Sequence, residues 1–250
     1  MPRADGRRPN QLRQVKIVRG YTELAPGSVL MAMGKTRVLC TASLEQAVPE
    51  WREALGGWLT AEYDMLPAAT GQRRSRNRFR LDGRTQEIQR VIGRVLRAVV
   101  DLKKLGPNTV WIDCDVLQAD GGTRTAGITG AFVALHDALR SAQSRALIKD
   151  WPIRDSVAAV SVGRVAGRLM LDLTYEEDSA AEVDLNVAVT GSGELVEVQG
   201  SGESATFARA ELDRMLTLAV RGTRQLQELQ RQALGRSPAG GSPRRRSAGG

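Results

Sequence analysis

Apolar and polar residues alternate along most of the first third of the chain, which is the period expected of half-buried β-strands. The alternation predicts strands at residues 15–18, 28–33, 36–42 and 58–63. Gly34-Lys35 separates the second and third of these strands and is typical of a two-residue hairpin loop. We therefore expect the opening third to be a β-meander.

Later apolar residues recur at steps of three and four, the spacing of an amphipathic helix. One such stripe runs from Ile88 to Leu102 and stops at Gly106-Pro107, and a second runs from Ile128 to Leu139. A last long helix is predicted from Phe207 onward.

The remaining apolar runs predict five further strands, of which the first precedes the second helix. These strands cover residues 110–117, 155–165, 168–174, 183–189 and 194–199. Two blocks of strands followed by helix predict an α+β fold, and the repetition of the block indicates a duplicated unit.

Composition narrows the class of protein. With 42% hydrophobic and 26% charged residues, the 250-residue chain has the make-up of a soluble globular protein. It has no apolar run long enough to span a bilayer and no apolar segment after its basic N-terminus, so we expect no membrane contact and a cytoplasmic location. The predicted organisation is a flexible lead-in at 1–11, one catalytic domain at 12–235 and a disordered basic tail at 236–250.

Part of the net charge of +8 is concentrated in the C-terminal tail. Four arginines and no acid lie in the Ser/Pro/Gly-rich tail, which leaves +4 for the body of the chain. A claim of nucleic-acid binding must therefore rest on where the charges lie.

Cysteine and histidine contribute little candidate chemistry. Cys40 and Cys114 both lie in strand-like runs, which predicts buried free thiols rather than a disulfide or a metal site. His136, the only histidine, falls inside a predicted helix, so we assign it a structural role. Any mechanism that needs two histidines is excluded.

The segment at 118–126 joins a predicted strand to a predicted helix and suits a phosphate group. Gly121-Gly122 allows close backbone approach, a helix start offers unpaired N–H groups, and Thr123 and Arg124 add a hydroxyl and a forked cation. The alternative is a tight turn with Thr125 as helix cap, and the loop alone supports both interpretations equally. The spacing excludes a Walker loop and a dinucleotide fingerprint.

An arginine-rich loop at 71–84 precedes the first helix. It holds six arginines against one acid and has no apolar periodicity. Like charges packed so densely repel one another unless an anion joins them, so we favour a contact with a polyanion, most obviously through phosphates, over a solvated surface loop. Arg84 stands at the helix start, where it would join a bound phosphate. The candidate residues for this polyanion contact are Arg73, Arg74, Arg76, Arg78 and Arg80.

Asp178 and Asp184 lie at the junction between an acidic segment and a predicted strand. Their spacing alone favours a solvated acidic turn. Together with an arginine-lined phosphate pocket, however, they would provide a divalent-cation site or a proton donor for a leaving oxygen. The sequence does not divide these two roles between them.

Several long motifs resemble the bacterial ribonuclease PH family, and the likeness runs from about residue 5 to residue 234. They lie at residues 39–43, 58–67, 83–90, 113–126, 176–184 and 197–200. The resemblance implies a ribosomal protein S5 domain 2-like α+β fold with a duplicated β-sheet/helix unit. It also implies a hexameric ring, a trimer of dimers, whose RNA entrance the basic loop would line.

The activity that this resemblance implies is phosphate-dependent 3′→5′ trimming of tRNA precursors and other RNA 3′ ends, with nucleotide addition as the reverse reaction. Inorganic phosphate would attack the last phosphodiester and release a nucleoside 5′-diphosphate. Arg84 and residues 122–124 (Gly122, Thr123, Arg124) would bind the phosphate. Asp178 and Asp184 would hold Mg²⁺ or supply the acid.

The chain departs from the family pattern near the basic loop. Ala68 replaces an arginine, Asp82 replaces a glycine, and the loop is shorter. These changes bear on tRNA positioning, for which the loop arginines would compensate. The rival interpretation is a non-catalytic RNA-binding ring subunit of an exosome-like assembly. A subunit without chemistry has no need of Arg84, Arg124, Asp178 and Asp184 together, which favours the enzyme.

Overall fold

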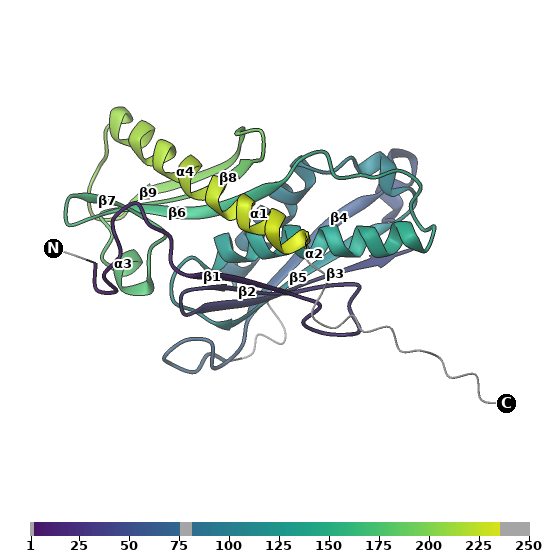
Figure 1. The fold of residues 1–250 in the computed structure, drawn as a ribbon, viewed down its shortest axis with the longest axis horizontal. Coiled ribbons are helices and arrows are strands. Elements are labelled where there is room, and N and C mark those ends of the chain that lie inside the picture. The colour runs from purple at the N-terminus through teal and green to yellow at the C-terminus, as the bar shows by residue number, and fades with distance from the viewer. Residues whose placement is uncertain (1–2, 76–81, 236–250) are drawn as a thin grey trace.

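The structure, a computed structural model, describes residues 3–75 and 82–235 and contains two β-sheets with helices packed between and beside them (Figure 1). The first sheet has the strand order β1-β2-β3-β5-β4. Its strands are β1 (Val15–Arg19), β2 (Gly27–Met33), β3 (Thr36–Glu45), β4 (Trp58–Met65) and β5 (Thr109–Gln118). Two helices pack on it, α1 (Gly83–Ala98) and α2 (Thr123–Ser144).

The second sheet has the order β7-β6-β8-β9. Its strands are β6 (Val157–Val165), β7 (Arg168–Leu171), β8 (Val183–Thr190) and β9 (Leu195–Gly202). The short helix α3 (Tyr175–Ser179) follows β7, and the long helix α4 (Arg209–Leu234) packs on β6 and β8. Each half of the chain thus combines antiparallel strands with helix, and the predicted α+β fold is confirmed.

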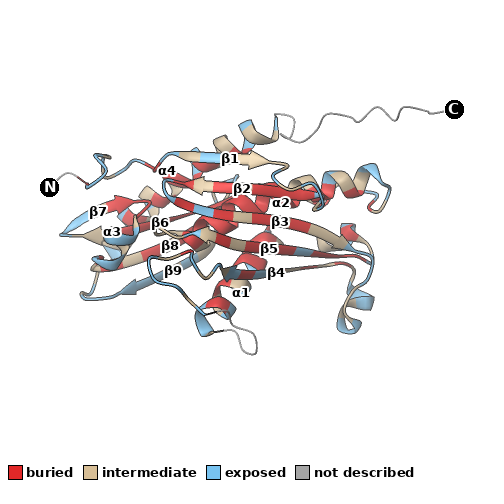
Figure 2. Cartoon of the chain, turned by 90° about the horizontal axis from the view of Figure 1, so that it is seen from below, coloured by how far each residue is buried: buried red, intermediate tan, exposed pale blue. Residues whose placement is uncertain are grey.

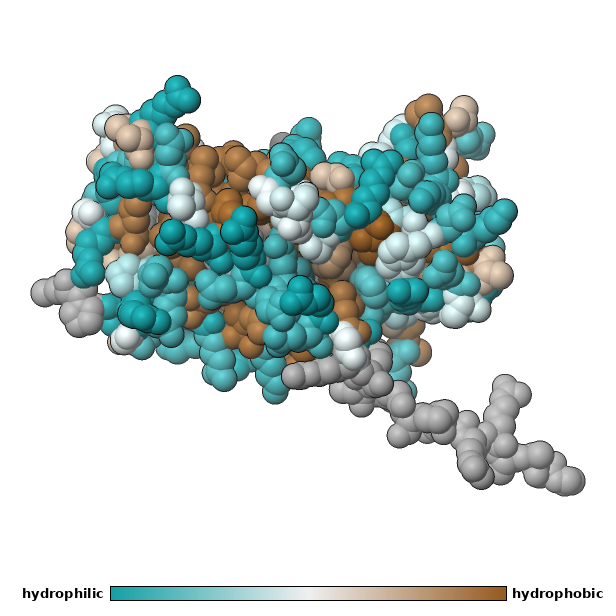
Figure 3. All heavy atoms as spheres, turned by 45° about the horizontal axis from the view of Figure 1, so that its top comes forward, coloured by the Kyte–Doolittle hydropathy of each residue, from teal (hydrophilic) through white to brown (hydrophobic). Residues whose placement is uncertain are grey.

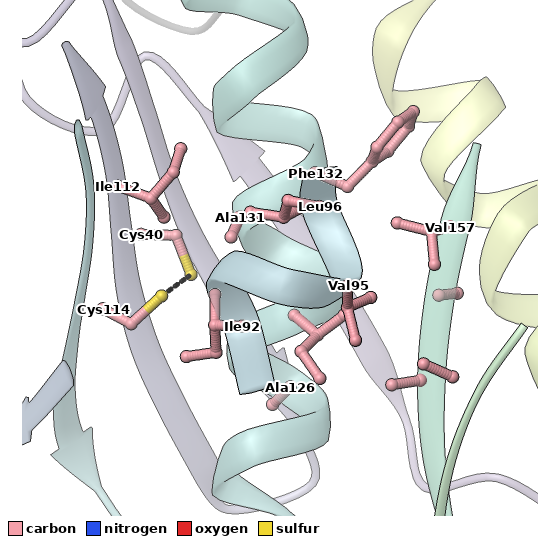
Figure 4. Close-up of a cluster of buried hydrophobic side chains, with 14 of the residues drawn as sticks. Cys40, Ile92, Val95, Leu96, Ile112, Cys114, Ala126, Ala131, Phe132 and Val157 are labelled. Carbon is pink, nitrogen blue, oxygen red and sulfur yellow. Dashed lines mark hydrogen bonds between the residues drawn. The ribbon is translucent and has the colours of Figure 1, made fainter. Parts of the chain in front are cut away.

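Helix α2 is the centre of the molecule, because it contacts β2 and β3 of the first sheet and β6 of the second. Fifteen of its 22 residues are buried, so its sequence lacks the polar stripe of a surface helix. Figure 4 shows α1 and α2 packed against Cys40 and Cys114 on one side, with Phe132 and Val157 on the other. A Cβ on Gly130 would lie 2.8 Å from Cys40 Sγ, so this glycine permits the close packing.

Burial alternates along the strands of the first sheet, as Figure 2 shows. On the face that Figure 3 presents, hydrophilic residues cover most of the surface and hydrophobic ones gather in patches between them. The predicted hairpins at 34–35 and 191–193 are confirmed, and Cys40 and Cys114 are buried free thiols 3.9 Å apart. His136 packs edge-on against Trp151, which agrees with the structural role expected of it.

Two sequence expectations were wrong. The meander holds for β1 to β3, but β4 pairs in parallel with β5 instead of returning along β3. The stripe from Ile88 to Leu102 overestimates α1, which ends at Ala98; the backbone then forms a bridge between Val100 and Ile153 and a 3-10 turn over Leu102–Leu105. Long-range pairing overrides local periodicity at both places.

Residues 3–11 contain no helix or strand, where the sequence predicts a flexible lead-in. Arg3 is nevertheless buried, with only 5% of its surface exposed, and it bonds to backbone oxygens of Leu171 and Asp172. Among the described residues, no helix combines the length and apolar character needed to cross a bilayer. The tail at 236–250 lies outside the described residues.

Candidate active site

The glycine loop joins β5 to α2 as the sequence predicts. Gly121 and Gly122 both have left-handed backbone angles, with φ of +72° and +62°, which glycine adopts without strain. A Cβ on Gly121 would lie 2.5 Å from the carbonyl oxygen of Leu173, so the segment before α3 passes directly against the loop. Neither glycine tolerates a side chain at low cost.

The start of α2 has no side-chain cap. Gly122 is the N-cap residue, and Thr125 donates its hydroxyl to the Gly122 carbonyl 3.0 Å away instead of accepting from the helix N–H groups. The alternative in which Thr125 caps the helix is therefore wrong. The first N–H groups of α2 are left for a ligand or water, and they carry the positive end of the helix dipole.

A cavity of about 730 Å³ opens in front of this loop and brings together parts of three helices. Arg84 from α1, Gly122 and Thr123 from the start of α2, and Asp178 from α3 all line it. Three of the four predicted phosphate-binding residues and one of the two predicted aspartates thus share one concave site, whereas Arg124 and Asp184 do not line it. Its size suits a ligand larger than a phosphate ion alone.

Tyr63 at the end of β4 is a site residue that the sequence analysis missed. Its buried hydroxyl donates a hydrogen bond to Thr123 Oγ1 at 2.8 Å, which fixes the first residue of α2. Burial raises the pKa of Tyr63, and the nearby charges of Arg84 and Arg124 oppose that rise. Both arginines are therefore electrostatic neighbours of the same buried hydroxyl.

Arg124 does not line the cavity, and its side chain binds residues of α1 and β9. Its guanidinium donates to Gln199 Oε1 at 2.8 Å and to Glu87 Oε1 at 3.3 Å, and Gln199 also donates to Glu87 at 2.7 Å. This network connects α2 to α1 and β9. Glu87 and Gln199 lie in the motifs that carry the family resemblance, which is the only sequence signal that would have selected them.

Asp178 lies in α3, and Asp184 lies in β8. Burial first, and then the negative charge of Asp178, raise the pKa of Asp184 to about 6, although Arg124 opposes the shift. Burial also raises the pKa of Asp178, against the opposing charges of Arg84, Arg124 and Arg13. Asp178 therefore acts on Asp184, and Arg124 is an electrostatic neighbour of both carboxyl groups.

The donor set suits a hard divalent cation. Asp184 Oδ2 accepts from Asn186 at 3.0 Å, whereas its Oδ1 is buried with no hydrogen-bond partner among the described residues. An unpaired buried carboxylate oxygen is costly unless a cation or proton joins it. Mg²⁺ is commonly held by one or two carboxylates together with waters and substrate oxygens. No cluster of three or more metal-binding side chains occurs within 3–75 and 82–235.

Residues 71–75 and 82–84 of the basic loop lie within the described part of the structure. Arg73 and Arg74 line the cavity, and Arg74 forms an ion pair with Asp82 at 2.9 Å. Asp82 also accepts from the backbone N–H of Thr85 at 2.7 Å, so it caps the helix that carries Arg84. Arg76, Arg78 and Arg80 lie outside the described residues. Asp82, the departure from the family pattern, thus supports the position of Arg84.

The family comparison covers both sheets. Residues 11–141 match the model of the 3′ exoribonuclease family, domain 1, and residues 155–222 match domain 2 of that family.

Individual relatives agree with this match. The chain is 58% identical over 236 residues to Ribonuclease PH of Rhodococcus erythropolis, which covers 93% of this chain and 90% of the relative. It is equally similar to Ribonuclease PH of Corynebacterium glutamicum, with 58% identity over 93% of this chain and 96% of the relative. Among solved structures, the Archaeoglobus fulgidus exosome with RNA bound to the active site superposes with a TM-score of 0.76 and 25% identity, covering 91% of this chain and 92% of that one.

Proposed function

The chain belongs to the 3′ exoribonuclease family, and from this premise we propose that it shortens RNA from the 3′ end with inorganic phosphate as the nucleophile. Its substrates are tRNA precursors that carry a 3′ extension, and the name Ribonuclease PH of relatives 58% identical supports this assignment. The observation that carries the proposal is the single cavity in which Arg84, Gly122, Thr123 and Asp178 meet.

The reaction replaces one phosphoester bond with another. A phosphate oxygen attacks the phosphorus of the last internucleotide linkage, the bond from that phosphorus to the O3′ of the preceding nucleotide breaks, and O3′ takes up a proton. The products are a nucleoside 5′-diphosphate and an RNA one nucleotide shorter. Because the bond energies are similar on both sides, the reverse reaction adds nucleotides from diphosphates.

We assign the binding of the attacking phosphate to Arg84, Arg124 and the glycine loop at the start of α2. Arg84 of α1 lines the cavity together with Gly122 and Thr123 at the start of α2, whose N–H groups and hydroxyl we assign to the phosphate. We assign Arg124 to the same phosphate, for which its guanidinium would turn from Gln199 and Glu87. Fixed donors of this kind position the nucleophile and offset charge that develops during phosphoryl transfer.

We assign Asp178 and Asp184 to the side of the site where the O3′ leaving atom lies. They would hold Mg²⁺, which supplies positive charge beside the leaving oxygen and the substrate phosphates. With a pKa of about 6, Asp184 also exchanges a proton readily near neutral pH, so one carboxyl group of the pair would protonate O3′. We leave the division of these two roles open.

The proposed function also bears on the oligomeric state of the chain and on its location in the cell. We assign the chain to a hexameric ring built as a trimer of dimers, which suits a family in which a solved relative is an exosome. The substrate class implies the cytoplasm, where RNA precursors are made and processed. Ring size is measured directly by light scattering of the full chain.

The test of the function is the chemical identity of the released nucleotide. A 3′-extended tRNA is incubated with the full chain and Mg²⁺, with and without inorganic phosphate. We expect nucleoside diphosphate, released only when phosphate is present. Nucleoside monophosphate without phosphate would mean hydrolysis, and RNA binding without release in either arm would support the rival, a non-catalytic ring subunit.

The basic loop should govern affinity for RNA rather than the chemistry. Replacing Arg73, Arg74 and Arg76 together with alanine should weaken binding of single-stranded RNA at low salt. Because each phosphate contact contributes about 0.7 to the slope of log affinity against log salt, the slope should flatten by up to about 2.

The matched control replaces three exposed lysines that do not line the cavity, Lys103, Lys104 and Lys149, with alanine, which changes the net charge equally. If both triple variants flatten the slope alike, the loop makes no specific contact and the assignment is wrong.

A further inference from the structure

Among the arginines of the N-terminal segment, Arg13 contacts the glycine loop, and Arg3 and Arg7 contact the segment that carries Asp178. We propose that Arg13 is a positioning residue for phosphate binding: it holds the loop peptides in the orientation that presents their N–H groups to the phosphate. The proposal rests on the phosphorolytic function proposed above. It assigns a role to a side chain outside the cavity and outside the motifs recognised in the sequence.

Arg13 contacts the loop from behind. Its side chain is only 3% exposed, its Nη1 donates to the carbonyl of Asp120, and its Nη2 reaches the carbonyl of Gly121 at 3.4 Å. Thr36 in β3 assists, because its hydroxyl donates to the Gly121 carbonyl at 2.7 Å and accepts from the Asp120 N–H at 2.9 Å. The carbonyl oxygens of two successive peptides are thus fixed on the side of Arg13.

The direction of the carbonyls determines the direction of the N–H groups. In a trans peptide, C=O and N–H point in opposite directions, so fixing the carbonyls of Asp120 and Gly121 turns the N–H groups of Gly121 and Gly122 away from Arg13. Both glycines line the cavity of Arg84 and Asp178, and Arg13 does not. The held orientation therefore presents N–H groups to the phosphate.

A loop of two glycines needs such a restraint. Glycine populates both signs of φ readily, so the peptide between Gly121 and Gly122 would rotate at low cost if nothing held its oxygen. A rotated peptide would direct a carbonyl oxygen into the cavity and repel a phosphate. Arg13 and Thr36 raise the cost of that rotation by the hydrogen bonds it would break.

Arg13 also ties the loop to Asp172, in the segment before α3. Its Nη2 lies 2.6 Å from Asp172 Oδ1, and its backbone N–H donates to Asp172 Oδ2 at 2.7 Å. Asp172 is fully buried and has a left-handed φ of +56°, which a non-glycine residue adopts only under restraint. It lies between β7 and α3, six residues before Asp178.

Arg3 continues the connection into α3. Its guanidinium makes two hydrogen bonds to Glu177, at 2.7 and 2.6 Å, and Glu177 precedes Asp178 directly. Arg7 lies against the same carboxylates, 3.8 Å from Asp172 and 3.6 Å from Glu177. The N-terminal segment thus joins the phosphate loop of the first half to the aspartate-bearing helix of the second.

The test compares two substitutions at the loop with one elsewhere. Arg13→Lys keeps the charge opposite Asp172 but loses the fork that reaches both carbonyls, and Thr36→Val removes the second restraint with little change in volume. We expect KM for inorganic phosphate to rise at least tenfold in Arg13→Lys and about threefold to tenfold in Thr36→Val. Affinity for RNA should stay within twofold of the wild type in both.

Arg19→Lys is the matched control. Arg19 is also nearly buried, but its partners lie outside the glycine loop: it pairs with Asp137 of α2 at 2.5 Å and donates to the carbonyl of Ala233 of α4 at 2.9 Å. It should lower the melting temperature comparably and leave KM for phosphate unchanged.

If Arg13 has a purely structural role, Arg13→Lys should lower the melting temperature as Arg19→Lys does and leave KM for inorganic phosphate unchanged in the folded protein. That result would overturn the proposal. If Arg13→Lys does not fold, Thr36→Val decides by the same criterion. Wild-type release of nucleoside diphosphate, measured in parallel, separates the two claims. Its absence would defeat the proposed function, whereas its presence with unchanged KM in the variants would defeat only the role of Arg13.

Discussion

In Asp184→Asn, kcat is expected to fall at least a hundredfold. In the absence of divalent cations at pH 7.5, the free energy of unfolding of this variant should be higher than that of the wild type. The loss of activity follows because either role of Asp184, metal ligand or proton donor, requires a carboxyl group. The gain in stability follows because the folded chain holds this carboxylate at a cost, with a pKa raised to about 6 by burial and by Asp178.

The sign of the stability effect depends on pH. The unfolded pKa of an aspartate is about 3.9, so between about pH 4 and pH 6 the folded state binds a proton that the unfolded state has released. The free energy of unfolding of the wild type therefore falls across this window and stays lower above it. The loss is about 2 kcal/mol, because the pKa of this partly solvated carboxyl group rises from about 4 to about 6 on folding. Asparagine removes that cost at neutral pH and changes little at pH 4.

The measurement is urea unfolding in a chelating buffer at pH 4 and pH 7.5. Asp115→Asn is the control: burial raises the pKa of this β5 residue as well, but the charges that act on it are those of Asp113, Asp64 and Glu62 and not those of Arg84, Arg124 or Asp178, so its variant should keep wild-type activity. A wild type that is as stable as Asp184→Asn at pH 7.5 would contradict the burial cost assigned to this carboxylate.

Arg84→Ala should raise KM for inorganic phosphate by about 10- to 100-fold, because a charge-assisted hydrogen bond to a phosphate contributes about 1.5–3 kcal/mol. Arg84→Lys should recover only part of the affinity, since an ammonium group lacks the planar fork. Initial rates over a range of phosphate concentrations at saturating RNA give both constants.

Arg90→Ala provides the comparison on the same helix. Arg90 is exposed on α1 like Arg84 but does not line the cavity, so its loss should leave KM for phosphate within twofold of the wild type. Equal effects of the two substitutions would show that general positive charge, and not a contact from Arg84, attracts the phosphate.

Most of the site could be predicted from sequence because its parts have local signatures. Gly121-Gly122 between a β-branched run and an apolar helical stripe indicates a strand-to-helix loop, and the structure places that loop beside Arg84 and Asp178. Three of the four α-helices in the described part of the chain were found by their apolar periodicity.

What the sequence did not reveal depends on contacts between distant residues. Helix α3 has five residues, all of them polar or exposed, so no apolar period marks it; its capping box at Thr174 and Glu177 was the available signal. Tyr63 and Arg13 are single residues whose partners lie 60 and more than 100 positions away. A buried arginine in a basic N-terminal segment has no pattern that separates it from a solvated one.

The origin of the phosphate in the product tests the central claim most directly. A 3′-extended tRNA is incubated with the full chain, Mg²⁺ and ³²P-labelled inorganic phosphate, and the released nucleotides are separated. We predict that the label appears in the terminal phosphate of nucleoside diphosphates, because inorganic phosphate forms the new bond. Release of unlabelled nucleoside monophosphates at the same rate would show that water is the nucleophile and would contradict the account.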